Sequence, residues 1–383
     1  MDKGHGTGDQ GVDTQPDTES PMAQSESIAH QLLCTLLADD AAWRAAARDV
    51  GALKRQGKLD IYALLVTVVL GVSVRGPTAI AQIGHLLSMV TGQRFARSSV
   101  WSRFTPAFRD LVQQVLDTSV RDARARAPRP PGVLAGFRDV LAVDATVVKV
   151  HDRLRHHWRG TRRNSAPAAI KLHTWVRALT GELVKYKLTA DAHGDARAFG
   201  IDHALRGTLV LIDKAYSSPS LWRRIDRVRG YFLTRLPADR NPMIAGSNRR
   251  HRGRARVVRE RPLRRVLDGL QRQILDVNAR FRCRVRRYRR EKNRWVEEEF
   301  RLVAIRDRKG RYEVFATNAP PELLPAEVVA QTYRLRWEVE TFYKTAKSGC
   351  GLTELPSTKP HIVETLVYAA VLRATTSMQA LSR

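Results

Sequence analysis

The chain has 383 residues, of which 43% are hydrophobic and 27% are charged, and this balance excludes an intrinsically disordered protein. Its 66 Lys and Arg against 38 Asp and Glu give a net charge of +28, which favours a polyanionic partner such as nucleic acid. Three cysteines without a close pair argue against a disulfide framework or a zinc knuckle. The longest apolar run, 61–74, is shorter than the ~20 residues that cross a bilayer. We therefore expect a cytoplasmic protein without membrane contact.

The N-terminal third reads as a tail followed by helices. Residues 1–26 are acidic and rich in Gly, Ser, Thr and Gln, which predicts a disordered tail. Apolar residues recur at helical spacing over 27–127, which predicts a helical domain. Two short helical patterns within 79–108 flank Gly92 and are typical of a helix-turn-helix that reads DNA. An ordinary helical bundle with a glycine turn fits the same pattern. A proline-rich linker, 128–132, ends this part.

Strand patterns dominate after the linker. The first part of a mixed α/β core is expected over 133–236, and its second part over 312–383. The stretch 241–310 between them holds 23 Lys or Arg against 8 Asp or Glu, with alternations typical of half-buried strands. We expect a basic, β-rich insertion over 237–311. The second part should contain a helix that begins at Pro325 and runs through Lys347, and a final apolar helix over 361–381.

Two aspartates lie in or beside strongly apolar strands. Asp144 interrupts the run 140–148, and Asp213 directly follows 208–212. A carboxylate in a buried strand costs several kcal/mol unless it is paired or binds a cation. If the two strands are neighbours, these carboxylates can converge, and Glu340 on a helix packed over the sheet can join them. Three carboxylates are the ligands that Mg²⁺ or Mn²⁺ prefers.

Each acid also has a simpler interpretation. Asp213 can cap the turn that follows it, Asp144 can pair with Lys149, and Glu340 can pair with Arg336 one helical turn earlier. The three together, in a strongly basic protein, favour a metal site that acts on nucleic acid.

Four polar residues form a stripe on the helix that is expected to end near Lys347. At about 100° per residue, Tyr333, Arg336, Glu340 and Lys347 fall within about 60° of one another. Arg336 and Lys347 would hold phosphates beside the metals, and Tyr333 would add a hydroxyl donor. A solvated charged helix face is the alternative.

The same four residues carry a resemblance to a known family. They match the signature Tyr-x2-Arg-x3-Glu-x6-Lys, and the chain resembles the DDE transposases of bacterial insertion sequences, most closely the insertion-sequence-four family. The segments 143–146 and 213–216 resemble the two aspartate motifs of that family, with Ala215 where Gly is usual. The resemblance covers roughly 55–380.

The resemblance implies a fold and a reaction. The fold would be an RNase H-like mixed-sheet core, interrupted between Asp213 and Glu340 by a β-rich insertion and preceded by the helical domain. Asp144, Asp213 and Glu340 would be the catalytic metal ligands for Mg²⁺ or Mn²⁺. The protein would bind double-stranded DNA at inverted terminal repeats, cut it and transfer it to target DNA, as a homodimer in a synaptic complex in the bacterial nucleoid. Trp295, the only Trp of the insertion, would stack a flipped base, although a structural Trp fits equally well.

Two other interpretations stay open. A nuclease with the same core but without strand transfer would carry the same acids. Only 36 residues follow Lys347, fewer than in many relatives, which agrees with a truncated or inactive copy that binds DNA as a repressor. The sequence leaves undetermined the terminal repeat, the target-site preference, the cleavage route and the oligomeric state.

Overall fold

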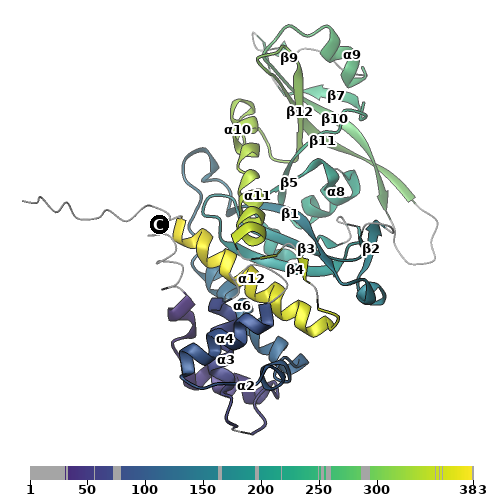
Figure 1. The fold of residues 1–383 in the computed structure, drawn as a ribbon. Helices are drawn as coiled ribbons and strands as arrows, with labels where there is room; N and C mark the ends of the chain where they lie inside the picture. The colour runs from purple at the N-terminus through teal and green to yellow at the C-terminus, as the bar shows by residue number, and fades with distance from the viewer. Residues whose placement is uncertain are drawn as a thin grey trace, which may run out of the picture.

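A computed structural model describes most of the chain as one mixed α/β arrangement (Figure 1). The predicted tail, 1–26, lies outside the described residues. Within the described ranges no helix is long and apolar enough to cross a membrane. The described residues are 31, 33–55, 57–71, 79–162, 166–194, 198–216, 218–248, 250–251, 254–255, 260–285, 294–349, 351–352, 354–355 and 357–381.

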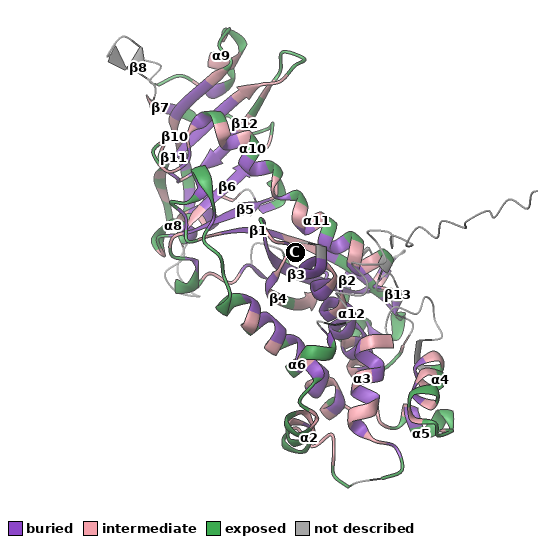
Figure 2. Ribbon diagram, turned by 90° about the vertical axis from the view of Figure 1, so that its left-hand side faces the viewer, coloured by how far each residue is buried: buried purple, intermediate pink, exposed green. Residues whose placement is uncertain are grey.

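Helices dominate the first third. The long helix α6 shows why they form there: Thr105 caps it by accepting a hydrogen bond from the Phe108 amide at 3.2 Å, and Pro106 occupies the first turn. Its apolar residues form a buried stripe, and its outer face is exposed (Figure 2). The helices before the sheet are α2 (Asp40–Asp49), α3 (Ile61–Gly71), α4 (Ala79–Thr91), α5 (Arg97–Trp101) and α6 (Pro106–Ala125).

The two helices of the predicted DNA reader are α4 and α5. Gly92 lies between them with a positive φ of 66°, a conformation that glycine adopts without strain. The second helix has five residues, which is little more than one turn. A role of this pair in reading DNA stays a prediction.

One large mixed sheet forms the body of the molecule. Its strand order is β2-β3-β1-β5-β6-β12-β11-β10-β7, with β4 paired to β3 and the short β13 to β1. The first strands are β1 (Asp139–Val150), β2 (Arg159–Arg162), β3 (Ala166–Arg177), β4 (Leu183–Ala190), β5 (Thr208–Ile212) and β6 (Tyr231–Arg235). The later strands are β7 (Met243–Ser247), β8 (Arg250–His251), β9 (Arg254–Ala255), β10 (Ile274–Val285), β11 (Arg294–Arg306), β12 (Tyr312–Thr317) and β13 (Glu354–Leu355).

The basic region 237–311, where we expect a β-rich insertion between the two parts of the core, contributes strands to the main sheet. Its strands β7, β10 and β11 join the sheet of the core through β12 and β6. Figure 1 shows them at the end of the molecule away from the N-terminal helices. The sheet continues because the backbone of β6 would otherwise be an unpaired edge, and β12 pairs with it. Short helices accompany these strands: α8 (Pro219–Arg227) and α9 (Leu263–Asp268).

The C-terminal helices cover the face of the sheet opposite to the one on which α8 packs. After a 3₁₀ turn (Ala326–Val328) come α10 (Val329–Arg334), α11 (Trp337–Lys344), a π-helical turn (Thr345–Gly349) and α12 (Pro360–Leu381). The final helix is buried along nearly its whole length and lies beside α6 (Figures 1 and 2). An ion pair between Arg109 and Glu364, with 2.5 Å from Nη1 to Oε2, joins the two helices. The N-terminal helices and α12 therefore share one hydrophobic core with the sheet.

Candidate active site

Asp144 and Asp213 lie side by side on neighbouring parallel strands. The register of β1 and β5 places Val143 opposite Ile212, so the two aspartates follow at adjacent positions. Neighbouring strands are ~4.8 Å apart. Val143 and Ile212 pack into the core on one face of the sheet, and successive side chains alternate, so both aspartates point to the face that α11 covers. The condition on which the predicted acid cluster depended, that the two strands are neighbours, holds.

The helix that carries Glu340 is interrupted on both sides, unlike the single helix that we expected. A tight turn with a hydrogen bond of 3.0 Å from the Arg336 amide to the Tyr333 carbonyl separates α10 from α11. After Lys344 the backbone widens into the π-helical turn. Lys347 lies in that turn, so the regular α-helical stripe of the sequence argument does not extend to it. The ammonium of Lys347 has no hydrogen bond or ion pair within the described ranges.

Arg336 is the residue that brings the acids together. Its Nη2 donates to Glu340 Oε1 at 2.5 Å, and its Nη1 lies 3.9 Å from Asp144 Oδ2. Burial lowers the pKa of Arg336, but the hydrogen bond and charge of Glu340, together with the charge of Asp213, raise it above its ordinary value. The guanidinium therefore stays charged among the three carboxylates.

The acids repel one another in spite of this cation. The pKa of Asp144 is raised to about 6, chiefly by burial; the Ala145 amide and the charge of Arg336 oppose this shift, and the charges of Asp213 and Glu340 contribute to it. The Asp144 side chain is 26% exposed, so the site is open to a ligand. Binding of a further cation would reduce the repulsion between these carboxylates and so stabilise the cluster.

Tyr333 is directed into the protein and not outward as the sequence argument supposed. It is buried, its hydroxyl donates to the Ile212 carbonyl at 3.4 Å, and its ring packs on Phe315 at 5.4 Å between centroids. The Arg336 guanidinium lies 5.7 Å from the centre of its ring. Tyr333 thus supports Arg336 and the residue that precedes Asp213.

Tyr343, one helical turn after Glu340, is a further residue of the site that was not predicted from the sequence. Its hydroxyl accepts from Thr174 Oγ1 at 2.7 Å and lies 2.7 Å from the carbonyl oxygen of Asp144 and 3.3 Å from that of Leu172. This tyrosine ties the helix of Glu340 to the strand of Asp144. The available signal was its spacing: a residue three positions after a site residue shares its helix face.

Trp295 lies on β11, far in sequence from Asp144, Asp213 and Glu340. Its ring is 52% exposed, and the Arg282 guanidinium lies 5.4 Å from the ring centre. The exposure leaves the indole available to stack on a partner. Its predicted role in binding DNA stays a prediction.

The carboxylates of the site are suitable ligands for a metal ion, but their side chains are not arranged around a common metal position. Within the described ranges no three His, Cys, Asp or Glu side chains are arranged so that they would hold a metal ion. Arg336 supplies the positive charge among Asp144, Asp213 and Glu340. An all-carboxylate donor set is nevertheless the one that hard divalent cations prefer.

The chain is similar to known transposases. The transposase for insertion sequence element IS231C of Bacillus thuringiensis subsp. berliner is 22% identical over 355 residues, covering 85% of this chain and 74% of that protein. The transposase for IS231D of Bacillus thuringiensis subsp. finitimus is 20% identical over 378 residues, covering 91% and 77%. A cryo-EM structure of the piggyBac transposase synaptic complex with hairpin DNA overlaps 95% of this chain and 77% of that chain with a TM-score of 0.45 and 11% identity, too loosely to carry an argument. The family model of the transposase DDE domain matches residues 135–375, which is more than half of the chain, and the chain therefore belongs to this transposase family.

Proposed function

We propose that this transposase binds the inverted-repeat ends of an insertion sequence, cuts them and joins the freed 3′ ends to target DNA. The observation that carries the proposal is the placement of Asp144 beside Asp213 on β1 and β5, with Arg336 linking Asp144 to Glu340. The narrower assignment to the insertion-sequence-four family belongs to this proposal, and the Tyr-Arg-Glu-Lys spacing supports it.

The proposal includes an RNase H-like core. The order β4-β3-β1-β5-β6 supports it, because the pairs β4–β3 and β3–β1 are antiparallel, whereas the pairs β1–β5 and β5–β6 are parallel. Such an order brings the first and fourth strands of the fold together at the centre of the sheet. Asp144 lies on β1, and Asp213 directly follows β5.

Asp144, Asp213 and Glu340 would hold the divalent cation, Mg²⁺ or Mn²⁺. When bound, the cation would lower the pKa of an attacking water or 3′-hydroxyl and stabilise the leaving oxygen. Hydrolysis would break the bond between phosphorus and the 3′ oxygen, add the water oxygen to phosphorus and release the 3′-hydroxyl. In strand transfer that hydroxyl would attack a phosphodiester of target DNA and release the 3′ bridging oxygen of one target strand.

The basic side chains of the site would position the DNA phosphate. The Nε of Arg336 is buried and has no hydrogen-bond partner within the described ranges, so it is a donor that an incoming phosphate oxygen can satisfy. Lys347, half-buried in the π-helical turn, would add a second positive charge. Tyr333 and Tyr343 would hold the backbone that carries the acids and would not touch DNA.

The partner would be double-stranded DNA, bound by a homodimer. The net charge of +28 and the basic stretch 241–310 support this partner. Trp295 would stack on DNA in the same complex.

The proposal is tested with DNA that carries the inverted repeats flanking the gene. We expect nicking at the repeat terminus with Mg²⁺ and none with EDTA, and joining of the cut ends to a target plasmid, all measured on gels. Cutting without joining would support the nuclease alternative. DNA binding without cutting, in Mg²⁺ and in Mn²⁺, would contradict the proposal and support the repressor alternative.

Replacement of Tyr343 by Phe tests the link between the acids. Losing the hydroxyl should lower the free energy of unfolding by ~1–3 kcal/mol, because Thr174 and the Asp144 carbonyl lose a buried partner. It should also weaken Mn²⁺ binding, measured by calorimetry, because Asp144 and Glu340 are no longer held together.

Tyr62→Phe is the matched control. The Tyr62 hydroxyl donates to the Leu37 carbonyl at 2.6 Å in the N-terminal helices, so this variant loses a similar hydrogen bond elsewhere. If both variants bind Mn²⁺ equally well, Tyr343 has only a structural role.

A further inference from the structure

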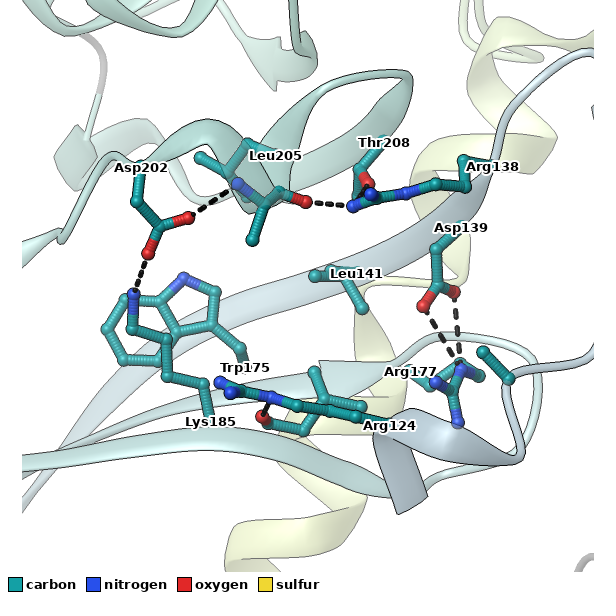
Figure 3. Close-up of a pocket in the computed structure, with 13 residues that line it drawn as sticks. Arg124, Arg138, Asp139, Leu141, Trp175, Arg177, Lys185, Asp202, Leu205 and Thr208 are labelled. Atoms are coloured by element: carbon teal, nitrogen blue, oxygen red, sulfur yellow. Dashed lines mark hydrogen bonds and ion pairs between the residues drawn. The ribbon is translucent and has the colours of Figure 1, made fainter. Parts of the chain in front are cut away.

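A cavity lies on the opposite side of the sheet from the acids. It has a volume of about 360 Å³ and opens between the end of α6, the start of β4 and the turn before β5 (Figure 3). Leu141 of β1 lines it, three positions before Asp144, and odd and even positions of a strand point to opposite faces. The cavity is therefore separate from the proposed cutting site. Its volume is within the usual range for a small-molecule site.

The lining of this cavity is positively charged. Four cationic side chains stand against two carboxylates, which leaves a net charge of +2. The charged lining residues are Arg124, Arg138, Arg177, Lys185, Asp139 and Asp202.

Both carboxylates are already satisfied by the protein. Asp139 accepts from Nε of Arg177 at 3.2 Å and from the Val140 amide at 2.8 Å. Asp202 accepts from Lys185 Nζ at 3.1 Å and from the Ala204 amide at 2.9 Å. The acids therefore serve as internal partners, and neither needs a cation from solution.

Several donors, in contrast, lack an acceptor. Nε of Arg124 donates to the Val184 carbonyl at 2.5 Å, but its two terminal amino groups have no hydrogen bond within the described ranges. The indole nitrogen of Trp175 is buried and has no partner there either, and the whole side chain is only 1% exposed. Figure 3 shows Arg124 extending under Trp175 towards Lys185, whose ammonium lies 5.0 Å from the centre of the Trp175 ring. Hydrogen-bond donors without an acceptor, in a positively charged lining, favour binding of an anionic ligand.

A second hollow continues this positive surface along β4. It has a volume of about 570 Å³ and shares Arg124 and Lys185 with the first cavity. Arg121 and Lys187 add two more cations to its lining, against Asp117 and Glu364. The positive charge therefore forms a path, as a chain of phosphates requires.

We propose that the cavity of Arg124, Lys185 and Trp175 binds the phosphate group of a nucleotide. Arg124 holds the phosphate with its terminal amino groups, Lys185 adds its charge, and the Trp175 indole donates to an oxygen of the ligand. The apolar side of the cavity, with Leu141 and Leu205, accommodates the sugar or the base. The phosphate comes either from a DNA backbone that crosses the far side of the sheet or from a free nucleotide.

Binding of deoxyadenosine monophosphate and of inorganic phosphate tests this proposal. Binding is measured by calorimetry on the full chain at about 150 mM salt. At this salt concentration the screening length is ~8 Å, so nonspecific electrostatic attraction is weak. We expect Arg124→Ala to weaken binding of the monophosphate at least about tenfold, as the loss of a charge-assisted hydrogen bond predicts. Arg124 is exposed, so its removal should not impair folding.

Arg126→Ala is the matched control, because Arg126 is exposed at the end of the same helix and does not line the cavity. It should bind the monophosphate as the unchanged protein does. Displacement of the monophosphate by saturating duplex DNA would identify the DNA backbone as the source, and persistent binding would identify a free nucleotide. Equal weakening in both variants, or no binding up to about 10 mM ligand, would overturn the proposal.

Discussion

Replacing Glu340 by Gln is expected to slow Mg²⁺-dependent cleavage of the repeat ends by at least about a thousandfold, because several kcal/mol of charge stabilisation would depend on the carboxylates that we propose as ligands of the cation. The amide keeps the shape of the side chain and can still accept from Arg336, so the fold and DNA binding should persist. The same result is expected for Asp144→Asn and Asp213→Asn. Cleavage rates on end-labelled DNA and binding by gel shift measure the two effects separately.

Glu338→Gln provides the control for this experiment. Glu338 lies on the same helix but two positions away, which places it about 200° around the helix axis from Glu340. It removes the same charge from the protein without touching the acid cluster. If the Glu340→Gln protein cuts DNA as fast as the Glu338→Gln protein, Glu340 has no role in cleavage.

The largest effect on stability is expected for Arg301→Met. Arg301 and Asp276 form a buried ion pair, each 4% exposed, with 2.9 Å from Nε to Oδ1 and 2.7 Å from Nη2 to Oδ2. Nη1 of Arg301 also donates to the carbonyls of Ala319 and Leu324 at 3.1 and 2.7 Å. Removing the arginine leaves a buried carboxylate unpaired, so urea denaturation should show a loss of ~3–5 kcal/mol in the free energy of unfolding.

Two further variants test whether this loss of stability comes from the unpaired buried charge of Asp276. Arg235→Met breaks an ion pair with Glu313 in which both side chains are nearly half exposed, and it should cost less than ~1 kcal/mol. Arg301→Met combined with Asp276→Leu removes the unpaired charge as well, so it should regain much of the stability. An Arg301→Met protein as stable as the Arg235→Met protein would show that the buried pair contributes little. The pair matters to the site because the segment that Arg301 holds leads directly into α10 and Arg336.

The sequence was sufficient to place the acids on the right kinds of elements. The apolar runs around Asp144 and before Asp213 predict buried strands, and both residues lie on or directly after such strands. The spacing of Arg336 and Glu340 predicts a shared helix face, and the two side chains form an ion pair. These inferences succeeded because they depend on local patterns: burial of a strand and the period of a helix are written in neighbouring residues.

Other features depended on contacts between distant segments. Tyr333 fits the pattern of an exposed stripe, yet its hydroxyl reaches the Ile212 carbonyl because α10 packs on the end of β5. The basic strands β10 and β11 lie in the stretch where we expect a β-rich insertion, and the tertiary structure shows that they extend the core sheet through β12. Neither result follows from periodicity, since pairing of strands and docking of helices are set by long-range packing.

The sequence by itself indicated the class of the protein: a strongly basic chain with two strand aspartates and, later in the chain, a set of Tyr, Arg, Glu and Lys whose spacing predicted a transposase. Only the tertiary structure decided that Arg336 lies among the acids, that Tyr343 joins their two elements and that a cationic cavity lies on the far side of the sheet. The reason is physical: local propensity and periodicity act over a few residues, whereas the position of a charge relative to another charge depends on how distant segments pack.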